Sequence, residues 1–480
     1  MNKRTRNIIL LIVGLQFVLI IGFLTLPQVV QAIPGRYRVA LQERIPVAST
    51  VLEEVIDQVA PVATALPAAN QPGNTAEVDI AALVARSTAV PSNEPTPSPE
   101  PTQEAVVVEE SEGVAEVEAT TTSASLSTDV PTNIPPPPPT QTPTPEPLPI
   151  NHVLEGMGVI KQTFNNCGPA NLTQVLNWYG NDITQEEIAA YLKPSSEDRN
   201  VSPWQIADYV NEQTSGVYMA VAHSGGKQEL IKELIVAGYP VVIEKGYELP
   251  ESGWWGHYLT VYGYDDNLGQ FYTQDSYLGP WDGSGRPATY TEVEQYWPQF
   301  NNTFYVVFKP EQEAEVKAII GPELSDKIRM WQLVAEHTQA QVEANPDDVF
   351  AWFNLGTALT RLGENVLEGN AKYYEAAAQA FDQAREIGLP PRMLWYQHRP
   401  YIAYDKVGRY QDVIDLANAT LATQGGRNVE ETYWYKGHAL AALGDLYGAQ
   451  DAYQSALAVN ENFYPAQISL DWVNTVINGN

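Results

Sequence analysis

Cysteine is almost absent from this chain of 480 residues, which contains only Cys167. A single thiol forms no disulfide within the chain and cannot build a thiolate metal site by itself. The simplest interpretation is a small buried apolar residue, because free cysteine is often fully buried. An unpaired cysteine in an exported protein can also be a reactive thiol. The neighbours of Cys167 decide between these two interpretations.

Basic residues are scarce as well. The chain has 27 Lys and Arg against 58 Asp and Glu, for a formal net charge of -31. A protein that binds nucleic acid needs a basic surface that displaces counterions from phosphates. We therefore expect no nucleic-acid partner. No basic residue lies between Arg86 and Lys161, where glutamates accumulate, and such a stretch is typical of a solvated linker.

Long apolar runs are limited to one, Ile8 to Leu26, which is 19 residues long. This length is close to the ~20 residues that a helix needs to cross the hydrocarbon core of a bilayer. Lys3, Arg4 and Arg6 precede the run, as on the cytoplasmic side of a membrane helix. We therefore predict a transmembrane helix within residues 1–32 and a single-pass protein of the cell membrane, with its folded domains extracytoplasmic.

A cleaved signal sequence is the alternative for residues 1–32. Val30-Gln31-Ala32 resembles a small-residue cleavage site, and cleavage would release a secreted protein. The apolar run is longer than the ~7–15 residues of a usual signal-peptide core, which favours the uncleaved anchor.

Residues 33–150 have no sustained apolar period and are predicted to be a disordered linker. Beyond Pro91 they consist mainly of Pro, Thr, Ser and Glu, and they cannot bury enough apolar area to offset chain entropy. One amphipathic stretch, Ser49 to Val59, fits a short helix. A proline-rich spacer of this kind would hold the folded part away from the membrane.

Residues 151–310 combine helical periods with later β-rich segments. This order, helices first and antiparallel strands second, predicts an α+β domain. The predicted helices are Pro169–Trp178, Thr184–Leu192, Pro203–Glu212 and Lys227–Ala237, and the predicted strands are Pro240–Ile243, His257–Tyr264, Gln270–Gln274 and Thr303–Phe308.

The remaining residues read as helical throughout. Residues 311–346 are predicted to be a helical connector, and residues 347–480 contain a repeat of small and aromatic positions. The repeated set is Trp352, Leu355, Gly356, Leu359, Gly363, Ala377, Phe381 and Ala384, followed by Tyr433, Gly437, Leu440, Gly444, Ala449, Tyr453 and Ala456. This all-α pattern resembles the tetratricopeptide repeat, whose stacked helix pairs present a surface for protein partners.

Cys167 lies just before a predicted helix that Pro169 favours at its first turn. A thiolate there would face unpaired backbone N–H groups and the positive end of a helix dipole, which lower a thiol pKa. Gln162, just upstream, could turn its amide toward the same point. Together with the N–H of Cys167 it would form an oxyanion hole.

A nucleophilic thiol also needs a base and a group that orients the base. His257 opens a predicted strand, and Asp275 ends the next one. The turn Asp266 to Gly269 makes these strands antiparallel neighbours, so the two side chains can meet. Each residue also has a structural alternative, because His257 could bond to the backbone and Asp275 could cap a turn. His223 is a weaker candidate for the base.

These residues carry a resemblance to a known family. The stretch Gln162 to Ala170, the strand from Gly256 to Asp266 and the position of Asp275 look like the bacteriocin-processing cysteine peptidases, the double-glycine leader peptidases. The resemblance covers Val153 to Lys309. It implies a papain-like fold, with Cys167 as nucleophile, His257 as base, Asp275 as orienting residue and Gln162 in the oxyanion hole.

The chain departs from the transporter-linked members of that family. It has no second apolar span and no Gly-rich phosphate-binding loop, so leader cleavage coupled to export is not implied. The sequence predicts a thiol protease, a hydrolase that uses no cofactor or metal and acts on a peptide or protein substrate. Transpeptidation by the same residues is an alternative reaction. A surface adaptor that binds peptides without cleaving them is the alternative function.

Overall fold

The computed structural model describes residues 65–70, 79–88, 147–249, 253–365, 369–423 and 425–479. The predicted anchor or signal sequence, residues 1–32, lies outside these ranges, as does the predicted helix at Ser49–Val59. No helix within the described ranges is long and apolar enough to span a bilayer. Residues 148–479, together with the described residues before position 90, belong to one compact unit.

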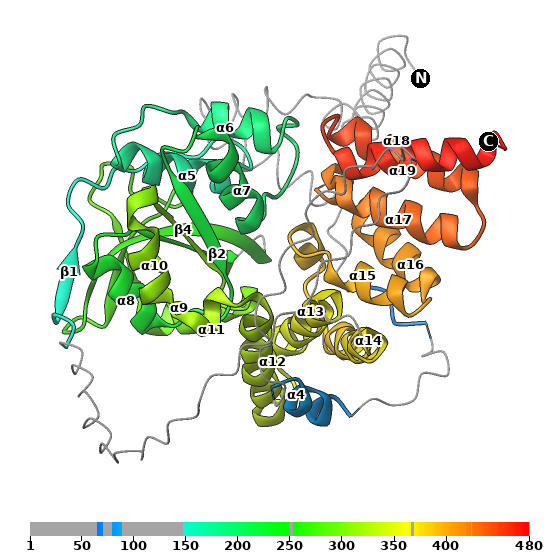
Figure 1. Ribbon diagram of the computed structural model, residues 1–480, viewed down its shortest axis with the longest axis horizontal. Helices are drawn as coiled ribbons and strands as arrows, with labels where there is room; N and C mark the ends of the chain where they lie inside the picture. The colour runs from blue at the N-terminus through cyan, green and yellow to red at the C-terminus, as the bar shows by residue number, and fades with distance from the viewer. Residues whose placement is uncertain are drawn as a thin grey trace, which may run out of the picture. The chain divides into compact units, whose positions relative to one another are not determined.

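A seven-stranded sheet organises the first part of this unit (Figure 1). Its strands pair in the order β2-β7-β3-β4-β5-β6, with β1 pairing β4. All the pairings are antiparallel. The strands are β1 (Asn151–Val153), β2 (Met219–His223), β3 (Val241–Leu249), β4 (Gly253–Asp265), β5 (Gln270–Gln274), β6 (Arg286–Thr289) and β7 (Phe304–Phe308).

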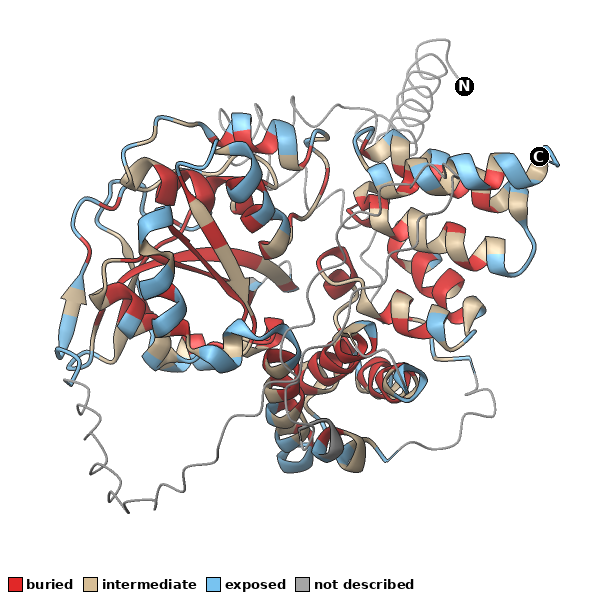
Figure 2. Ribbon diagram, in the orientation of Figure 1, coloured by how far each residue is buried: buried red, intermediate tan, exposed pale blue. Residues whose placement is uncertain are grey.

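Helices cover both faces of the sheet. One face packs against α5 (Cys167–Trp178), α6 (Gln185–Leu192) and α7 (Pro203–Gln213), and the other against α8 (Gln228–Val236), α9 (Tyr290–Tyr296) and α10 (Glu313–Ile320). Alternate residues of β7 enter the two cores, Tyr305 the first and Phe304 and Val306 the second. Figure 2 shows the central strands and much of α5 as buried.

The predicted elements of this α/β part are present, with shifted boundaries. Thr184 caps α6 in a reciprocal pair with Glu187, as its Thr-x-x-Glu motif predicts. The helix after the cysteine begins at Cys167 itself, two residues earlier than predicted, because Asn166 already provides the N-cap. β4 begins at Gly253, so His257 lies inside a strand rather than at its start. β1, β2, β6 and α9 were not predicted.

The predicted connector, residues 311–346, is helical and contributes residues to two cores. After the short η1 (Pro298–Phe300) and η2 (Pro310–Gln312), it contains α10, α11 (Pro322–Ser325) and α12 (Lys327–Ala344). Val316 of α10 belongs to the core of the sheet, whereas Trp331 of α12 belongs to the core of the following helices. Gly321, with a φ of +83°, separates α10 from α11.

The helices that follow pack against one another in sequence. They are α13 (Val349–Asn365), α14 (Asn370–Ile387), η3 (Pro391–Trp395), α15 (Arg399–Lys406), α16 (Tyr410–Leu421), η4 (Gly426–Asn428), α17 (Glu430–Ala442), α18 (Leu446–Val459) and α19 (Tyr464–Ile477). Gly356, Gly363 and Gly437 of the predicted repeat face aromatic rings, those of Phe381, Tyr374 and Tyr453, whereas nothing lies within 4 Å of a Cβ at Gly444. The tetratricopeptide assignment stays a prediction.

Two pieces of residues 33–150 depart from the prediction of a disordered linker. Residues 80–88 form α4 (Ile80–Thr88), and Val84 is buried in the core of the helical region. Pro67 accepts hydrogen bonds from Arg385, whose guanidinium also pairs with Asp412 at 2.9 Å. The apolar side chains of Leu66 and Val84 are buried, and their burial favours the packing of these two pieces.

The close approach of helices in the repeat gives a stability prediction. A Cβ at Gly356 would lie 2.7 Å from the ring of Phe381, so we expect Gly356→Val to destabilise the protein by about 1–3 kcal/mol through overpacking. Gly158 is the matched control, since nothing lies within 4 Å of its Cβ position. The midpoint of urea denaturation, followed by circular dichroism, should fall for Gly356→Val and not for Gly158→Val. Equal midpoints for the two variants would contradict this packing.

Candidate active site

Cys167 is the first residue of α5 and is half-buried. The preceding residue, Asn166, occupies the N-cap position, but its side chain accepts no hydrogen bond from the first N–H groups of the helix. The thiol therefore lies at a helix end where backbone donors and the positive end of the helix dipole favour negative charge. The placement agrees with the prediction that a thiolate would be stabilised here.

His257 and Asp275 meet beside this helix end. His257 lies in β4, opposite Lys245 of β3, and Asp275 directly follows the last residue of β5, the strand that pairs with β4. The His257 Nε2 atom and the Asp275 Oδ1 atom are 3.0 Å apart, and both side chains are buried. The Cys167 thiol hydrogen-bonds to the side chain of His257. Since Nε2 faces the carboxylate, Nδ1 is the ring nitrogen left for the sulfur.

Asp275 is held by its own backbone surroundings. Its Oδ1 atom also accepts the N–H groups of Tyr277 and Leu278, each at 2.8 Å. Burial by itself would raise the pKa of this carboxyl group, but His257 and the two amide donors outweigh it and lower the pKa to about 2. The carboxylate is therefore ionised over the whole physiological range and fixes the imidazole ring.

The electrostatics favour a thiolate–imidazolium pair. Burial alone would raise the pKa of Cys167, but the hydrogen bond and charge of His257, with smaller effects of Lys193 and the Tyr258 backbone, lower it below its ordinary value. Burial alone would lower the pKa of His257, whereas Asp275 and Cys167 raise it to about 9. The charged pair therefore persists from the lowered pKa of the thiol up to about pH 9.

Gln162 is hydrogen-bonded to Ser276, the residue that follows Asp275, and so lies near the same site. The backbone N–H of Gln162 donates to the Ser276 carbonyl at 2.9 Å, and the Ser276 hydroxyl donates to Gln162 Oε1 at 2.8 Å. Within the described residues, the Nε2 group of Gln162 donates no hydrogen bond, so it is available to a ligand. The structure thus places Gln162 beside the residue that follows Asp275.

Asn171 links the three segments of the site and was not singled out from the sequence. Its amide nitrogen donates to the carbonyls of Cys167 and Tyr258 and to the Ser276 hydroxyl, at 2.8, 3.1 and 3.2 Å. It is fully buried in α5, one helical turn after Cys167. Its polar character on a buried helix face is the signal that could have identified it.

Two further titratable groups lie near Cys167. Lys193 is buried and donates to the carbonyls of Asn165 and Asp198, at 2.8 and 2.7 Å, and burial lowers the pKa of its ammonium group. Glu244 of β3 is buried, and burial followed by the charge of Cys167 raises its pKa well above the ordinary value. Neither residue has a sequence signal, because each is brought to the thiol by tertiary packing.

The remaining sequence candidates lie elsewhere. His223 is the last residue of β2, a strand separated from β4 by β7 and β3. Asp265 accepts the N–H groups of Asn267 and Leu268, and so forms the hairpin turn as expected. Within the described ranges, no group of three or more His, Cys, Asp or Glu side chains could hold a metal ion.

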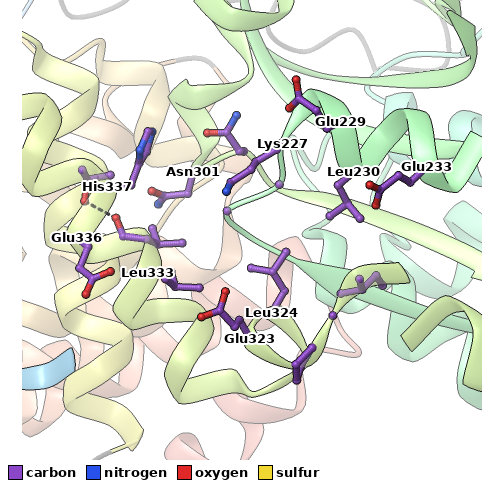
Figure 3. Close-up of a pocket in the computed structure, with 18 of the residues that line it drawn as sticks. Lys227, Glu229, Leu230, Glu233, Asn301, Glu323, Leu324, Leu333, Glu336 and His337 are labelled. Carbon is purple, nitrogen blue, oxygen red and sulfur yellow. Dashed lines mark hydrogen bonds between the residues drawn. The ribbon is translucent and has the colours of Figure 1, made fainter. Parts of the chain in front are cut away.

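A cavity of about 610 Å³ lies apart from these residues (Figure 3). It is lined by α8, by the turn between α10 and α11, and by α12, and neither Cys167 nor His257 is among its lining residues. Its labelled side chains include Leu230, Leu324 and Leu333 with Glu229 and Glu233. The chemistry of the thiol therefore does not take place in this cavity.

Comparison with known proteins agrees with the type of domain that the sequence predicts for residues 151–310. Residues 153–305 match the model of the Peptidase_C39 like family. No curated protein matches the chain. The family match supports a papain-like cysteine peptidase domain in the α/β part, with an antiparallel sheet, and leaves the following helical region unassigned.

The electrostatics of the site predict an unusual pH dependence of thiol alkylation. We expect iodoacetamide to react with Cys167 at a rate that stays near its plateau well below pH 8.5, the approximate pKa of a free thiol. His257→Ala should raise the thiol pKa, because the hydrogen bond and charge of His257 no longer oppose the effect of burial. The reaction at pH 6 should then slow by at least about tenfold. His223→Ala is the matched control and should leave the profile unchanged. A profile insensitive to His257 would contradict the pairing.

Proposed function

We propose that this protein is a membrane-tethered, extracytoplasmic cysteine peptidase that hydrolyses peptide bonds at Cys167. The observation that carries the proposal is the contact of Cys167, His257 and Asp275, in which each side chain hydrogen-bonds to the next. The family match over residues 153–305 supports the same reaction class. The single-pass anchor is proposed from the sequence of residues 1–32.

Acylation begins from the thiolate–imidazolium pair. The Cys167 sulfur attacks the carbonyl carbon of the scissile peptide bond, and the carbonyl electrons move onto oxygen to give a tetrahedral intermediate. The oxyanion is stabilised by the N–H of Cys167 at the start of α5 and by the Nε2 group of Gln162. The Ser276 hydroxyl holds the Gln162 amide in place by donating to its oxygen, which leaves its nitrogen unused, and Asn171 in turn donates to the Ser276 hydroxyl.

His257 then acts as an acid. As the tetrahedral intermediate collapses, the C–N bond breaks and the imidazolium gives its proton to the leaving amine, which leaves a thioester on Cys167. Asp275 keeps the ring oriented throughout and stabilises its positive charge. The carboxylate remains ionised because its pKa is about 2.

Deacylation regenerates the site. Neutral His257 removes a proton from a water molecule, the resulting hydroxide attacks the thioester, and the carboxylic acid leaves as the C–S bond breaks. An amine in place of water would give transpeptidation by the same steps. The helical region would recruit the substrate or a protein partner, as paired-helix arrays do.

Single substitutions test the assigned roles. We expect Cys167→Ala to abolish cleavage of a mixed peptide library, with a loss of at least about 10³-fold in turnover, because no other nucleophile can replace the thiolate. Gln162→Ala should lower turnover by about 10²–10³-fold, since one oxyanion donor is lost, while leaving the alkylation of Cys167 by iodoacetamide intact. Products are measured by mass spectrometry, and circular dichroism checks the fold of each variant.

The Gln162→Ala variant tests catalysis separately from the reactivity of the thiol, because its turnover should fall while its alkylation by iodoacetamide stays intact. Retained cleavage in Cys167→Ala would overturn the proposal. A wild-type protein that binds peptides and cleaves none, with an ordinary thiol at Cys167, would indicate the non-catalytic adaptor instead.

A further inference from the structure

The helical region contributes side chains to the active-site end of the sheet. Tyr396, which follows η3, lies against Gly256, the residue directly before His257, where a Cβ would meet its ring at 3.1 Å. Its ring contacts Trp254 and Phe300, with centroids 5.9 and 6.0 Å apart. The Tyr396 side chain is 8 % exposed, so it fills the space beside this strand.

Tyr396 also reaches the cysteine side of the site. Its backbone carbonyl accepts a hydrogen bond from the Asn200 amide at 3.2 Å, and Asn200 belongs to the loop between α6 and α7. Burial, and then the charge of Cys167, raise the pKa of the Tyr396 phenol, and the backbone of Gly256 hydrogen-bonds to it. Tyr396 therefore contacts both the strand that carries His257 and the loop before α7.

Tyr396 thus forms a bridge between the strand of His257 and the loop before α7. A stack of guanidinium groups and indole rings strengthens this bridge. The Arg392 guanidinium lies 4.0 Å from the ring centroid of Trp255, on the histidine strand. Trp255 contacts Trp395 with centroids 6.0 Å apart, and Arg199 lies 5.5 Å from the Trp395 ring. The stack continues toward the thiol, because Arg199 also donates to the Asn165 side chain at 3.1 Å, two residues before Cys167.

The bridge has a consequence for any chain that reaches the thiol. An extended peptide advances by ~3.3 Å per residue, so the residues next to a scissile carbonyl pass the strand that carries His257 within one or two positions. At Gly256 that space is occupied by Tyr396, and the Gly256 backbone already hydrogen-bonds to its phenol. A chain that passed Gly256 on that side would meet the Tyr396 ring and a backbone group that its phenol already engages.

We propose that Tyr396, supported by Trp395 and Arg392, closes one side of the active site, so that the substrate is a peptide whose chain ends within one or two residues of the scissile bond there. This inference rests on the proposed peptidase function and adds its substrate class. The helical region thereby determines specificity, in addition to any partner that it binds. The protein trims peptide ends instead of cutting within a long chain.

Alkylation of Cys167 tests the closure without requiring turnover. Iodoacetamide serves as the short probe. An iodoacetyl-capped hexapeptide and a hexapeptidyl vinyl sulfone serve as long probes, whose chains leave the sulfur in opposite directions. In the wild type one long probe should react at least about tenfold more slowly than its one-residue analogue, as expected for a side chain excluded from a packed site.

Variants at position 396 decide the cause. Tyr396→Ala should remove most of that difference for the excluded probe and leave the rate with iodoacetamide unchanged. Tyr396→Phe keeps the ring and should behave as the wild type. Unimpaired reaction of both long probes in the wild type, or continued exclusion in Tyr396→Ala, would overturn the closure.

The same data distinguish a failure of the closure by Tyr396 from a failure of the proposed peptidase function. A thiol that reacts with iodoacetamide in a His257-dependent manner, and with both long probes equally, leaves the peptidase function standing and removes only the closure. A thiol that does not react with iodoacetamide in any variant removes the peptidase function and the closure with it. Mass spectrometry of library products provides an independent measure, since the wild type should release fragments from one chain end and Tyr396→Ala from internal positions.

Discussion

The hydrogen bond between His257 and Asp275 is the constraint on which the rest of the site depends. The carboxylate is anchored by the N–H groups of Tyr277 and Leu278, and it fixes Nε2 of the imidazole at 3.0 Å. With that nitrogen engaged, the ring presents its other nitrogen to Cys167. The lowered pKa of the thiol and the raised pKa of the imidazole are both consequences of this arrangement. Burial works against each charge, so the pair depends on its partners.

Residues of both the α/β part and the helical region surround the site. Asn171 connects the cysteine helix, the histidine strand and the segment after Asp275 through three hydrogen bonds, and thereby holds the interior side of the site. Tyr396 and its neighbours contact the outer side, at Gly256 and Asn200. The helical region is therefore packed onto residues next to the site, and its separation from them would expose both Trp254 and Phe300.

Local patterns predicted the parts of the fold whose signals are short-range. The capping box at Thr184, the proline at the start of α7, and the strand of Gln270–Gln274 are present as the sequence indicates. The hairpin turn at Asp265 also follows from local chemistry. The edge strand β2 and the short β6 have weak periodicity and were missed, because their pairing with β7 and β5 supplies the stability that their own residues lack.

The sequence by itself determined the candidate residues, because a helix start at Cys167 and a hairpin that brings His257 and Asp275 together are both local features. That the thiol meets this hairpin is a tertiary contact. Only the tertiary structure decided what surrounds them. Lys193, Glu244 and Tyr396 come from elements far apart in the chain, and no periodicity or spacing encodes their proximity to the thiol. The physical reason is that burial and charge act through space, so the pKa values and the closed side depend on packing rather than on sequence order.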